Sequence, residues 1–265
     1  MKVGDNLTQR RDHLDAIHLG RDQNVAKMSS LRIDIGAADK GEASGKVKPG
    51  DRIAFDARYL EIGERVLRGK AFDDRAGCSL LIDVLQDPDG YPVDVLAAFT
   101  VQEEIGLRGA MVAANTLKPD VSFALEGTSA GDQPDPTANP DDGEAINPTC
   151  VMGAGPVLTV IDSSTIISPR LHTFLRDTAS REGIPYQIKT RPGGGTDSGA
   201  IQYANGGTLV ANISLPCRYI HSPMAYLHRD DYDNALRLIK AALRSITPDV
   251  IAASGTMMSP NGSGR

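Results

Sequence analysis

A run of nine residues, VDVLAAFTV at positions 93–101, constrains the fold more than any other part of this sequence. The run is almost continuously apolar and has the length of a β-strand, which is the pattern of a strand buried on both faces of its sheet. Two adjacent glutamates, Glu103 and Glu104, follow it at once within VQEEIGLRGA. Adjacent carboxylates repel each other and add no stability to a strand. A solvated loop carries such a pair at no cost, so a functional role needs support from further motifs.

Strand-like and helix-like segments alternate from Leu67 onward, which predicts an α/β layered domain. Helices are expected at 74–87, 109–119, 168–184 and 230–246, and strands at 93–101, 121–126, 155–162, 186–190 and 207–214. The expected helix 74–87 has Asp73 or Asp74 as its natural N-cap. Its apolar face is formed by Ala76, Leu80, Leu81, Val84 and Leu85. The last helix is the clearest, with one face made of Tyr232, Leu236, Ile239, Leu243 and Ile246.

The two ends of the chain have a different composition from its middle. Residues 1–66 contain short β-like runs and turns without a long helix, which predicts a small, partial β module. The tail 253–265 is poor in hydrophobic residues and is expected to be disordered. We therefore expect three parts: a partial β module at 1–66, an α/β domain at 67–252 and the tail.

Charge and hydropathy argue against several kinds of partner. The 265 residues carry a net charge of -6, and no basic run stands out, so nucleic acids and anionic membranes are poor electrostatic partners. No apolar stretch approaches the ~20 residues that span a bilayer, and the polar N-terminus lacks the apolar core of a signal peptide. Three scattered cysteines, Cys78, Cys150 and Cys217, are typical of free thiols in a reducing compartment. We expect a soluble cytoplasmic protein.

Acidic side chains and one histidine lie at the expected ends of strands or the start of a helix, where function gathers in α/β sheets. They are Asp73 and Asp74 in GKAFDDRAG, the pair Glu103 and Glu104, Glu126 after VSFAL, and His221 in RYIHSP. Carboxylates and imidazole are ligands for zinc, cobalt and manganese. A binuclear centre needs one bridging carboxylate, terminal ligands for each ion and a base for the water between them. This inventory fits that arrangement.

Each of these residues also has an ordinary structural interpretation. Taken alone, Asp73 is most simply an N-cap and His221 a hydrogen-bonded histidine. His172 and His228 carry no motif and are expected to be structural, while His13 and His18 are expected at the surface. Asp162 and Arg108 fit either contacts that support a site or solvated loop ends, and the sequence leaves both alternatives open.

Five motifs in order resemble the TET-type metallo-aminopeptidases, a family whose members are also called glutamyl aminopeptidases or endoglucanase-like proteins. The motifs are AFDDRAG, VQEEIGLRGA, ALEGT, GGTDSGAIQ and RYIHSP, and the resemblance extends over roughly residues 28–250. It implies a mixed-sheet zinc-peptidase catalytic domain with helices on both faces. It also implies cytosolic enzymes that remove N-terminal residues from peptides and assemble from dimers up to hollow dodecamers through the β module.

The resemblance assigns a role to each motif residue. Asp73 would bridge two metal ions, Glu126 would bind the first, and Glu104 and His221 would bind the second. Glu103 would act as the general base that takes a proton from water and passes it to the leaving amine. The family also implies a cis peptide between Asp73 and Asp74. In the glycine-rich loop 192–200, Gly194, Gly195 and Asp197 resemble residues of a substrate or site loop. The implied cofactors are two divalent ions, zinc or cobalt, with manganese as a further candidate.

One expected ligand is absent from the sequence. The family takes a histidine for the first metal from a His-x-Asp-Glu type motif near the N-terminus, and no such motif occurs here. The chain therefore resembles a truncation, a split protein or a reduced paralogue, with a weak or empty first metal site. Two alternatives to an active aminopeptidase follow: a catalytically impaired homologue that acts as a binding or assembly subunit, and a two-metal amidase or deacylase for small molecules. The preferred N-terminal residue, the physiological metal and the oligomeric state are not readable from the sequence.

Overall fold

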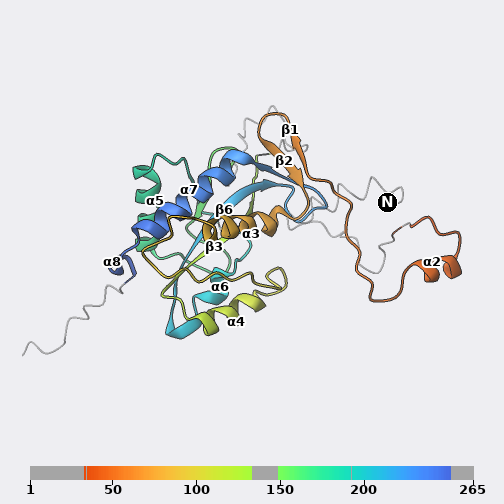
Figure 1. The fold of residues 1–265 in the computed structure, drawn as a ribbon, viewed down its shortest axis with the longest axis horizontal. Helices are drawn as coiled ribbons and strands as arrows, with labels where there is room; N and C mark the ends of the chain where they lie inside the picture. Colours follow the sequence, from red (N-terminus) through yellow and green to blue (C-terminus); the bar gives the residue numbers. More distant parts are fainter. Residues whose placement is uncertain (1–32, 34, 133–148, 192, 252–265) are drawn as a thin grey trace, which may run out of the picture.

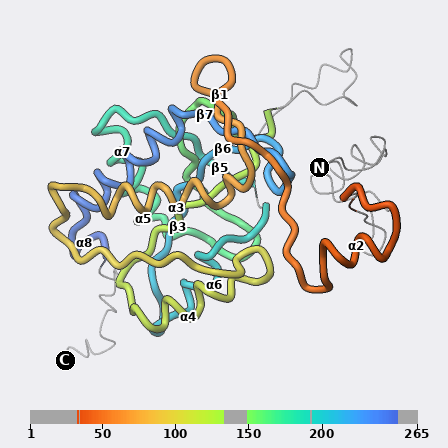
Figure 2. The backbone as a smooth tube through the Cα atoms, turned by 45° about the vertical axis from the view of Figure 1, so that its right-hand side comes forward, coloured from red at the N-terminus to blue at the C-terminus, as the bar shows by residue number. Residues whose placement is uncertain are grey.

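The computed structural model describes residues 33, 35–132, 149–191 and 193–251. The expected tail 253–265 and the histidines His13 and His18 lie outside these residues, as does half of the expected β module. The early helix α2 (Lys40–Lys46) precedes the stretch that leads to the first strand, and it lies apart from the main body, as Figures 1 and 2 show. None of its residues is buried. The proposed division of the chain at residue 66 stays a prediction.

The main body is built on one mixed sheet. The strands run in the order β1-β2-β7-β6-β4-β5, and β3 pairs with the other side of β6. The β3–β6 and β4–β5 pairs are parallel, and the other pairs are antiparallel. The strand bounds are β1 Leu60–Ile62, β2 Val66–Gly69, β3 Val121–Ser129, β4 Val157–Thr159, β5 Gln187–Lys189, β6 Leu209–Arg218 and β7 Ala225–His228.

Helices cover both faces of this sheet. One face carries α3, α5 and α7, and the other carries α4 and α6, as Figure 1 shows. The helix bounds are α3 Phe72–Leu85, α4 Arg108–Leu117, α5 Pro169–Arg181, α6 Ser198–Ile201, η3 Ala204–Gly206, α7 Arg229–Ser245 and α8 Pro248–Ile251. The expected mixed α/β domain with helices on both faces is confirmed. None of the helices in the described ranges is both long and apolar enough to cross a membrane.

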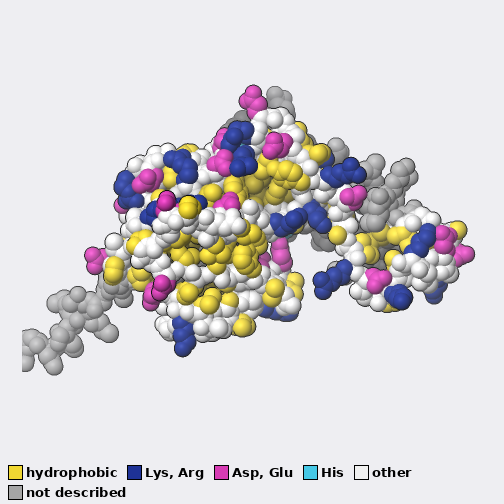
Figure 3. All heavy atoms as spheres, viewed as in Figure 1, with side chains coloured by type: hydrophobic (Ala, Val, Ile, Leu, Met, Phe, Trp, Pro, Cys, Tyr) yellow, Lys and Arg dark blue, Asp and Glu magenta, His cyan; other side chains and the backbone are white. Residues whose placement is uncertain are grey.

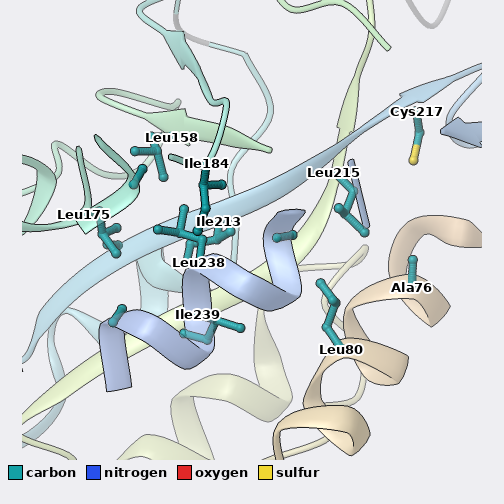
Figure 4. Packing of buried hydrophobic residues seen from close by; sticks show 14 of the residues in the cluster. Ala76, Leu80, Leu158, Leu175, Ile184, Ile213, Leu215, Cys217, Leu238 and Ile239 are labelled. Carbon is teal, nitrogen blue, oxygen red and sulfur yellow. The ribbon is translucent and has the colours of Figure 1, made fainter. Parts of the chain in front are cut away.

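The core lies between β6 and the helices α3, α5 and α7. Ile213 and Leu215 of β6 pack with Leu238 of α7 and Leu80 of α3, and all four side chains are fully buried (Figure 4). Burying one such side chain stabilises the fold by about 1.5–3 kcal/mol. This packing fixes β6 at the centre of the sheet, and the end of β6 leads directly to His221.

The segment 93–101 differs from the expectation of a strand buried on both faces. It is extended but has no hydrogen-bonded strand partner among the described residues. Leu96, Phe99 and Val101 are 52%, 53% and 66% exposed. The prediction of a buried strand was therefore wrong. A strand is buried on both faces only within a sheet, and the segment 93–101 has no neighbouring strand in the part of the chain that is described.

The apolar face of α3 is narrower than expected. Ala76, Leu80 and Val84 are buried, at the i, i+4, i+8 spacing of one helical stripe. Leu85 was expected on the same face but is 49% exposed, because it projects beyond the stripe that faces β3 and α7. The stripe on α7 follows the expected pattern, with Ile239 buried and Leu236 and Leu243 packed against the core.

Candidate active site

Asp73 and Asp74 occupy the sharp passage from β2 into α3. Ala71 has a left-handed conformation (φ 51°), and the two aspartates are non-helical, so the regular part of α3 begins after them. The peptide bond between Asp73 and Asp74 is cis. Asp74 Oδ1 accepts a hydrogen bond from the Gly77 amide at 3.0 Å, which is the role of a helix cap. Asp73 is thereby left free to point away from the helix.

Gly77 brings α3 unusually close to β3. A Cβ atom at this position would lie 2.2 Å from the backbone oxygen of Leu125, which no side chain tolerates. Gly127 allows an equally close approach between β3 and Asp73, because a Cβ atom at position 127 would lie 2.8 Å from the Asp73 Cβ. These two glycines therefore place the Asp73 carboxylate directly over the strand that carries Glu126.

His221 lies just beyond β6 in a turn with two left-handed residues, Tyr219 (φ 56°) and His221 itself (φ 61°). Non-glycine residues in this conformation are strained, and such strain clusters at functional sites. The turn carries the imidazole to the start of α3, where Nε2 lies 3.1 Å from Asp73 Oδ2 and 3.3 Å from Glu104 Oε2. The Asp73 hydrogen bond raises the pKa of His221 above its usual value.

Glu103 and Glu104 lie in a tight turn between the segment 93–101 and α4. The amides of Gly106 and Leu107 both donate to the Glu103 carbonyl oxygen at 3.0 Å. The Gly109 amide donates to the Val101 carbonyl at 2.9 Å and closes the turn. The turn therefore holds the two adjacent carboxylates at the beginning of α4, on the side of His221.

Asp73, Glu104 and His221 form the one group within the described ranges that could hold a metal ion. One ligand atom from each lies within 4.8 Å of the others. Two carboxylate oxygens and one imidazole nitrogen are a donor set that suits zinc and similar ions. The His221 and Glu104 side chains are 46% and 55% exposed, so an ion or a substrate can reach them from solvent.

Glu126 lies beside this trio but not within it. It stands on β3 directly opposite Ser214 of β6, and the Ser214 hydroxyl donates to Glu126 Oε1 at 3.1 Å. Burial raises the pKa of Glu126 well above its usual value, and the charges of Asp73, Asp74 and Glu103 raise it further. Ser214 belongs to no motif of the sequence, but pairing the expected strands 121–126 and 207–214 in parallel, with their last residues side by side, would have placed it opposite Glu126.

Repulsion among the carboxylates and their burial raise other pKa values in the same place. The pKa of Asp74 rises to about 8, first through burial and then through the charge of Asp73. The pKa of Glu103 rises to about 7, again through burial first and then through the charges of Glu104, Asp197 and Asp73. A carboxylate with a pKa near neutrality is suited to accept and return a proton. Such perturbed groups gathered at a cleft are typical of active sites.

The glycine-rich loop contributes Asp197 to this region. The Thr100 hydroxyl donates to Asp197 Oδ2 at 2.6 Å and ties the loop to the segment 93–101. The other oxygen, Oδ1, is buried and has no hydrogen-bond partner among the described residues. Gly194 and Gly195 are exposed, and Gly195 lies against the hydroxyls of Ser163 and Ser164 rather than against the metal-ligand trio.

A pocket of about 300 Å³ opens next to the trio. Asp73, Glu104 and His221 form one side of it, and Phe55, Phe72 and Pro223 are among its apolar walls. Lys70 adds an ammonium group that makes no hydrogen bond or ion pair with another described residue. The pocket is therefore mainly apolar, with polar groups at one end, which is the usual composition of a small-molecule site.

Other candidates have structural roles. His228 accepts a hydrogen bond from the Asp230 amide and caps α7, as expected of a structural histidine. Asp162 is buried, and its Oδ1 accepts from the amides of Ser164 and Thr165, so it organises a turn rather than solvating a loop end. Among the residues that the structure describes, the Arg108 guanidinium donates to Gln102 alone, at 3.4 Å. His172 is half-buried on α5.

The structure thus combines a mixed sheet that has helices on both faces with a cluster of two carboxylates and one histidine that could hold a metal ion, which makes it an α/β protein with a candidate metal site. The sequence model of the M42 glutamyl aminopeptidases matches residues 8–238. The chain belongs to this M42 family, which confirms the resemblance found in the sequence.

Relatives with known names support the same family. The chain is 35% identical to a provisionally named aminopeptidase of Acetivibrio thermocellus, over 84% of this chain and 64% of that protein. It is 34% identical to the glutamyl aminopeptidase of Lactococcus lactis subsp. cremoris, over 78% of this chain and 56% of that protein. It is 32% identical to the lysyl aminopeptidase of Pyrococcus furiosus, over 83% of this chain and 60% of that protein.

Solved structures share this architecture. An aminopeptidase from the archaeon Desulfurococcus kamchatkensis matches with a TM-score of 0.79 and 33% identity, over 91% of this chain and 66% of that chain. The TET1 peptidase of Pyrococcus horikoshii matches with a TM-score of 0.69 and 32% identity, over 86% of this chain and 65% of that chain. That peptidase can assemble into a tetrahedron or a large octahedral shell. The chain thus spans less than two thirds of the length of these relatives.

Proposed function

We propose that this chain carries the catalytic site of a metal-dependent aminopeptidase, which hydrolyses the N-terminal residue of peptides. The observation that carries the proposal is the approach of Asp73, Glu104 and His221 within 4.8 Å of one another, beside the half-buried Glu103 and Glu126. Three segments far apart in the sequence supply these groups. Membership of the M42 family and the names of three aminopeptidase relatives support this interpretation.

We assign two divalent metal ions to this cluster. Asp73, Glu104 and His221 would hold one ion, and Asp73 with Glu126 would hold the other, so that Asp73 bridges them. Zinc, cobalt and manganese all accept such ligands. Asp73 and Glu126 are only two protein ligands among the described residues, so we expect the ion that they would hold to bind more weakly. When bound, such ions lower the pKa of water and polarise a carbonyl group.

Glu103 is the proposed general base. Its carboxylate takes one proton from the water whose oxygen attacks the scissile carbonyl carbon, and it gives that proton to the nitrogen of the leaving peptide as the C–N bond breaks. Burial first, and then the neighbouring charges of Glu104, Asp197 and Asp73, raise its pKa to about 7, so the carboxylate can both receive and release the proton. Glu104, its neighbour in the sequence, is left to bind metal.

Two further features would place the substrate. The acidic groups around the site favour a positively charged α-ammonium, which restricts cleavage to the N-terminal residue. The pocket bounded by Phe55, Phe72 and Pro223 is the candidate site for the side chain of that residue. We assign Gly194, Gly195 and Asp197 to the loop that borders the bound peptide.

We further propose that the protein is cytoplasmic and assembles into homo-oligomers. The support for assembly is the Pyrococcus horikoshii relative, which forms tetrahedral or octahedral shells. Exposed apolar side chains at Ile53, Phe55 and Tyr59 precede β1 and would be covered in such contacts.

The test is hydrolysis of aminoacyl reporters that differ only in whether the α-amino group is free or acetylated. The native chain is run after chelation and after addition of zinc, cobalt or manganese, next to Glu103→Gln. Metal-dependent release from the free form alone supports an aminopeptidase. Release from the acetylated form would instead indicate a deacylase or amidase, and a folded chain that is inactive with every metal would contradict the proposal.

A further inference from the structure

The segment 93–101 leads directly to the proposed base Glu103, yet no sheet holds this segment in place. It runs between α3 and α4 (Figures 1 and 2), where a space-filling view shows hydrophobic side chains gathered at the surface (Figure 3). No strand in the described part of the chain pairs with it. The place of Glu103 therefore depends on side-chain contacts rather than on the hydrogen bonds of a ladder.

Two polar side-chain contacts join the stretch 93–104 to distant parts of the described chain. The Thr100 hydroxyl donates to Asp197 Oδ2 at 2.6 Å, and Glu104 Oε2 lies 3.3 Å from His221 Nε2. The second contact joins two proposed metal ligands, whose lone pairs a bound ion would take. The hydrogen bond between Thr100 and Asp197 is therefore the contact that remains to position the stretch when the site is filled.

The turn that presents Glu103 has internal hydrogen bonds that fix its shape. The amides of Gly106 and Leu107 both donate to the Glu103 carbonyl oxygen at 3.0 Å. These bonds do not fix the place of the turn relative to the sheet, because donors and acceptor all belong to the turn. Thr100 lies three residues before Glu103, so a hydrogen bond from its side chain anchors the turn as a whole.

The other partner of this hydrogen bond, Asp197, has a firm support. Its two neighbours in the sequence are buried, with Thr196 8% and Ser198 0% exposed. The Ser198 hydroxyl donates to Asn212 Oδ1 of β6 at 2.5 Å, and the Thr196 hydroxyl donates to Asp162 Oδ2 at 3.3 Å. The backbone on each side of Asp197 is thus bonded to the core, which makes Asp197 the fixed partner and Thr100 the held one.

The Asp197 carboxylate has no second hydrogen bond among the described residues. Its Oδ2 accepts from Thr100, while its Oδ1 is buried and has no partner there. A buried acceptor without a partner lowers stability. Stability alone therefore does not explain an aspartate at this position.

We propose that Asp197 is a positioning residue for Glu103. Its carboxylate holds the Thr100 hydroxyl, and through Thr100 it fixes the turn that presents the base to the attacking water and to the leaving amine. This inference rests on the proposed function. In this role Asp197 takes no part in the proton transfer itself and acts only through the place of Glu103.

The test removes the hydrogen bond and leaves the charge of Asp197 in place. Thr100→Val keeps the size of the side chain without its hydroxyl, and Thr100→Ser keeps the hydroxyl. Thr116→Val is the matched control, because the Thr116 hydroxyl also donates one hydrogen bond, to the Val112 carbonyl oxygen at 2.9 Å, but lies on α4 away from the turn. All three variants of the full chain should keep the native circular dichroism spectrum.

The first readout is the hydrolysis of aminoacyl reporters in the presence of zinc. Thr100→Val should lower kcat about tenfold or more, because a small misplacement of a reacting group is costly. Its KM and zinc affinity should stay within about twofold of the native values, because the hydrogen bond positions the base rather than substrate or metal. Thr100→Ser should have a kcat within about threefold of the native value, and Thr116→Val should match the native chain throughout.

The second readout is amide hydrogen exchange, which does not depend on catalysis. The amides of Gly106 and Leu107 donate to the Glu103 carbonyl oxygen, and their exchange should become about tenfold faster or more in Thr100→Val. The amide of Ile201, in the loop that carries the fixed partner, should keep its native rate. The control variant should change neither.

A double variant shows whether Thr100 acts through Asp197. Asp197→Ala removes the same hydrogen bond from the other side, so it should speed exchange in the turn of Glu103 as Thr100→Val does. The two changes together should speed this exchange no more than Asp197→Ala alone, because the two residues share one bond. Additive effects would show that the two side chains act separately and would overturn the proposal.

Other results would overturn it as well. These are native kcat in Thr100→Val, an equal loss in the control variant, no recovery in Thr100→Ser, a loss that appears in KM or zinc affinity instead of kcat, and native exchange at Gly106 and Leu107. A native chain without activity would contradict the proposed function. Exchange at Gly106 and Leu107 would then decide by itself whether Asp197 holds the turn.

Discussion

The imidazole Nε2 of His221 lies 3.1 Å from Oδ2 of Asp73, although 148 positions separate the two residues in the sequence. The strained turn after β6 and the passage from β2 into α3 bring them together. Glu104 completes the group from a third segment, with its Oε2 at 3.3 Å from the same nitrogen. Both the turn after β6 and the passage from β2 into α3 depart from ordinary backbone geometry to bring these side chains together. An accidental ion pair would not need two such departures.

Replacement of His221 by alanine should weaken zinc binding about tenfold or more, because it removes one of three ligands; even residues that only support a ligand cost 10–100-fold. Isothermal titration of the metal-free chain with zinc measures the effect. His172→Ala is the matched control, since His172 lies on α5 outside the trio and should bind zinc like the native chain. Equal affinities in the two variants would remove His221 from the ligand set.

Two leucines on α3 should respond to the same substitution with losses of stability of very different size. Leu80 is fully buried against the core, and Leu80→Ala should lower the free energy of unfolding by about 2–5 kcal/mol. Leu85 is 49% exposed, and Leu85→Ala should cost less than about 1 kcal/mol. Urea denaturation of both variants measures the two values. A large loss at Leu85 would show that this side chain is covered in solution.

Asp162 should be a structural residue whose loss affects stability. Its Oδ1 accepts from two amides, those of Ser164 and Thr165, each at 2.7 Å. Asp162→Ala leaves these donors without a partner, so the free energy of unfolding should fall by about 2–4 kcal/mol. Asp177→Ala, at an exposed position on α5, should stay within about 0.5 kcal/mol of the native value. The midpoints of urea unfolding compare the two, and a stable Asp162→Ala would contradict this role.

Asp231 predicts a pH dependence of stability. It is fully buried at the start of α7, where burial raises its pKa to about 6, although the Gly153 and Gly155 amides donate to it at 2.7 Å. In the unfolded chain its pKa is about 3.9. Between these values the folded chain holds the proton and the unfolded chain does not, so this contribution is complete below about pH 4 and is lost as the pH rises through about 6.

The shift of about two pKa units corresponds to about 3 kcal/mol. The free energy of unfolding is therefore measured at pH 4 and pH 7 for the native chain and for Asp231→Asn, which cannot titrate. The native chain should lose up to about 3 kcal/mol more than the variant between these two pH values. Equal losses would show that Asp231 is already ionised at pH 4 in the folded chain.

Local patterns were sufficient to predict most helices and strands. The stripe from Tyr232 to Ile246 predicted α7, and the Ser-Pro start and Gly183 stop predicted α5, because helix periodicity and end signals depend on neighbouring residues. The segment 93–101 could not be predicted in the same way. Its composition indicates burial on both faces, but burial depends on what lies beside it in space, and no described strand pairs with it.

The same limit applies to the site. The motifs named Asp73, Glu104 and His221, and the structure brings these three together. The sequence did not reveal the contact of Ser214 with Glu126 or of Thr100 with Asp197, because each depends on the register of segments that are distant in the chain.

The most direct measurement of the central claim is the rate of amino acid release by the native chain and by Glu103→Gln, each with its zinc content measured in the same sample. Glutamine keeps the size of the side chain but cannot accept the proton, so we expect equal zinc content and a loss of activity of about a hundredfold or more. Comparable activity in the two samples, or a native chain that binds zinc and is folded but releases no amino acid, would contradict the account.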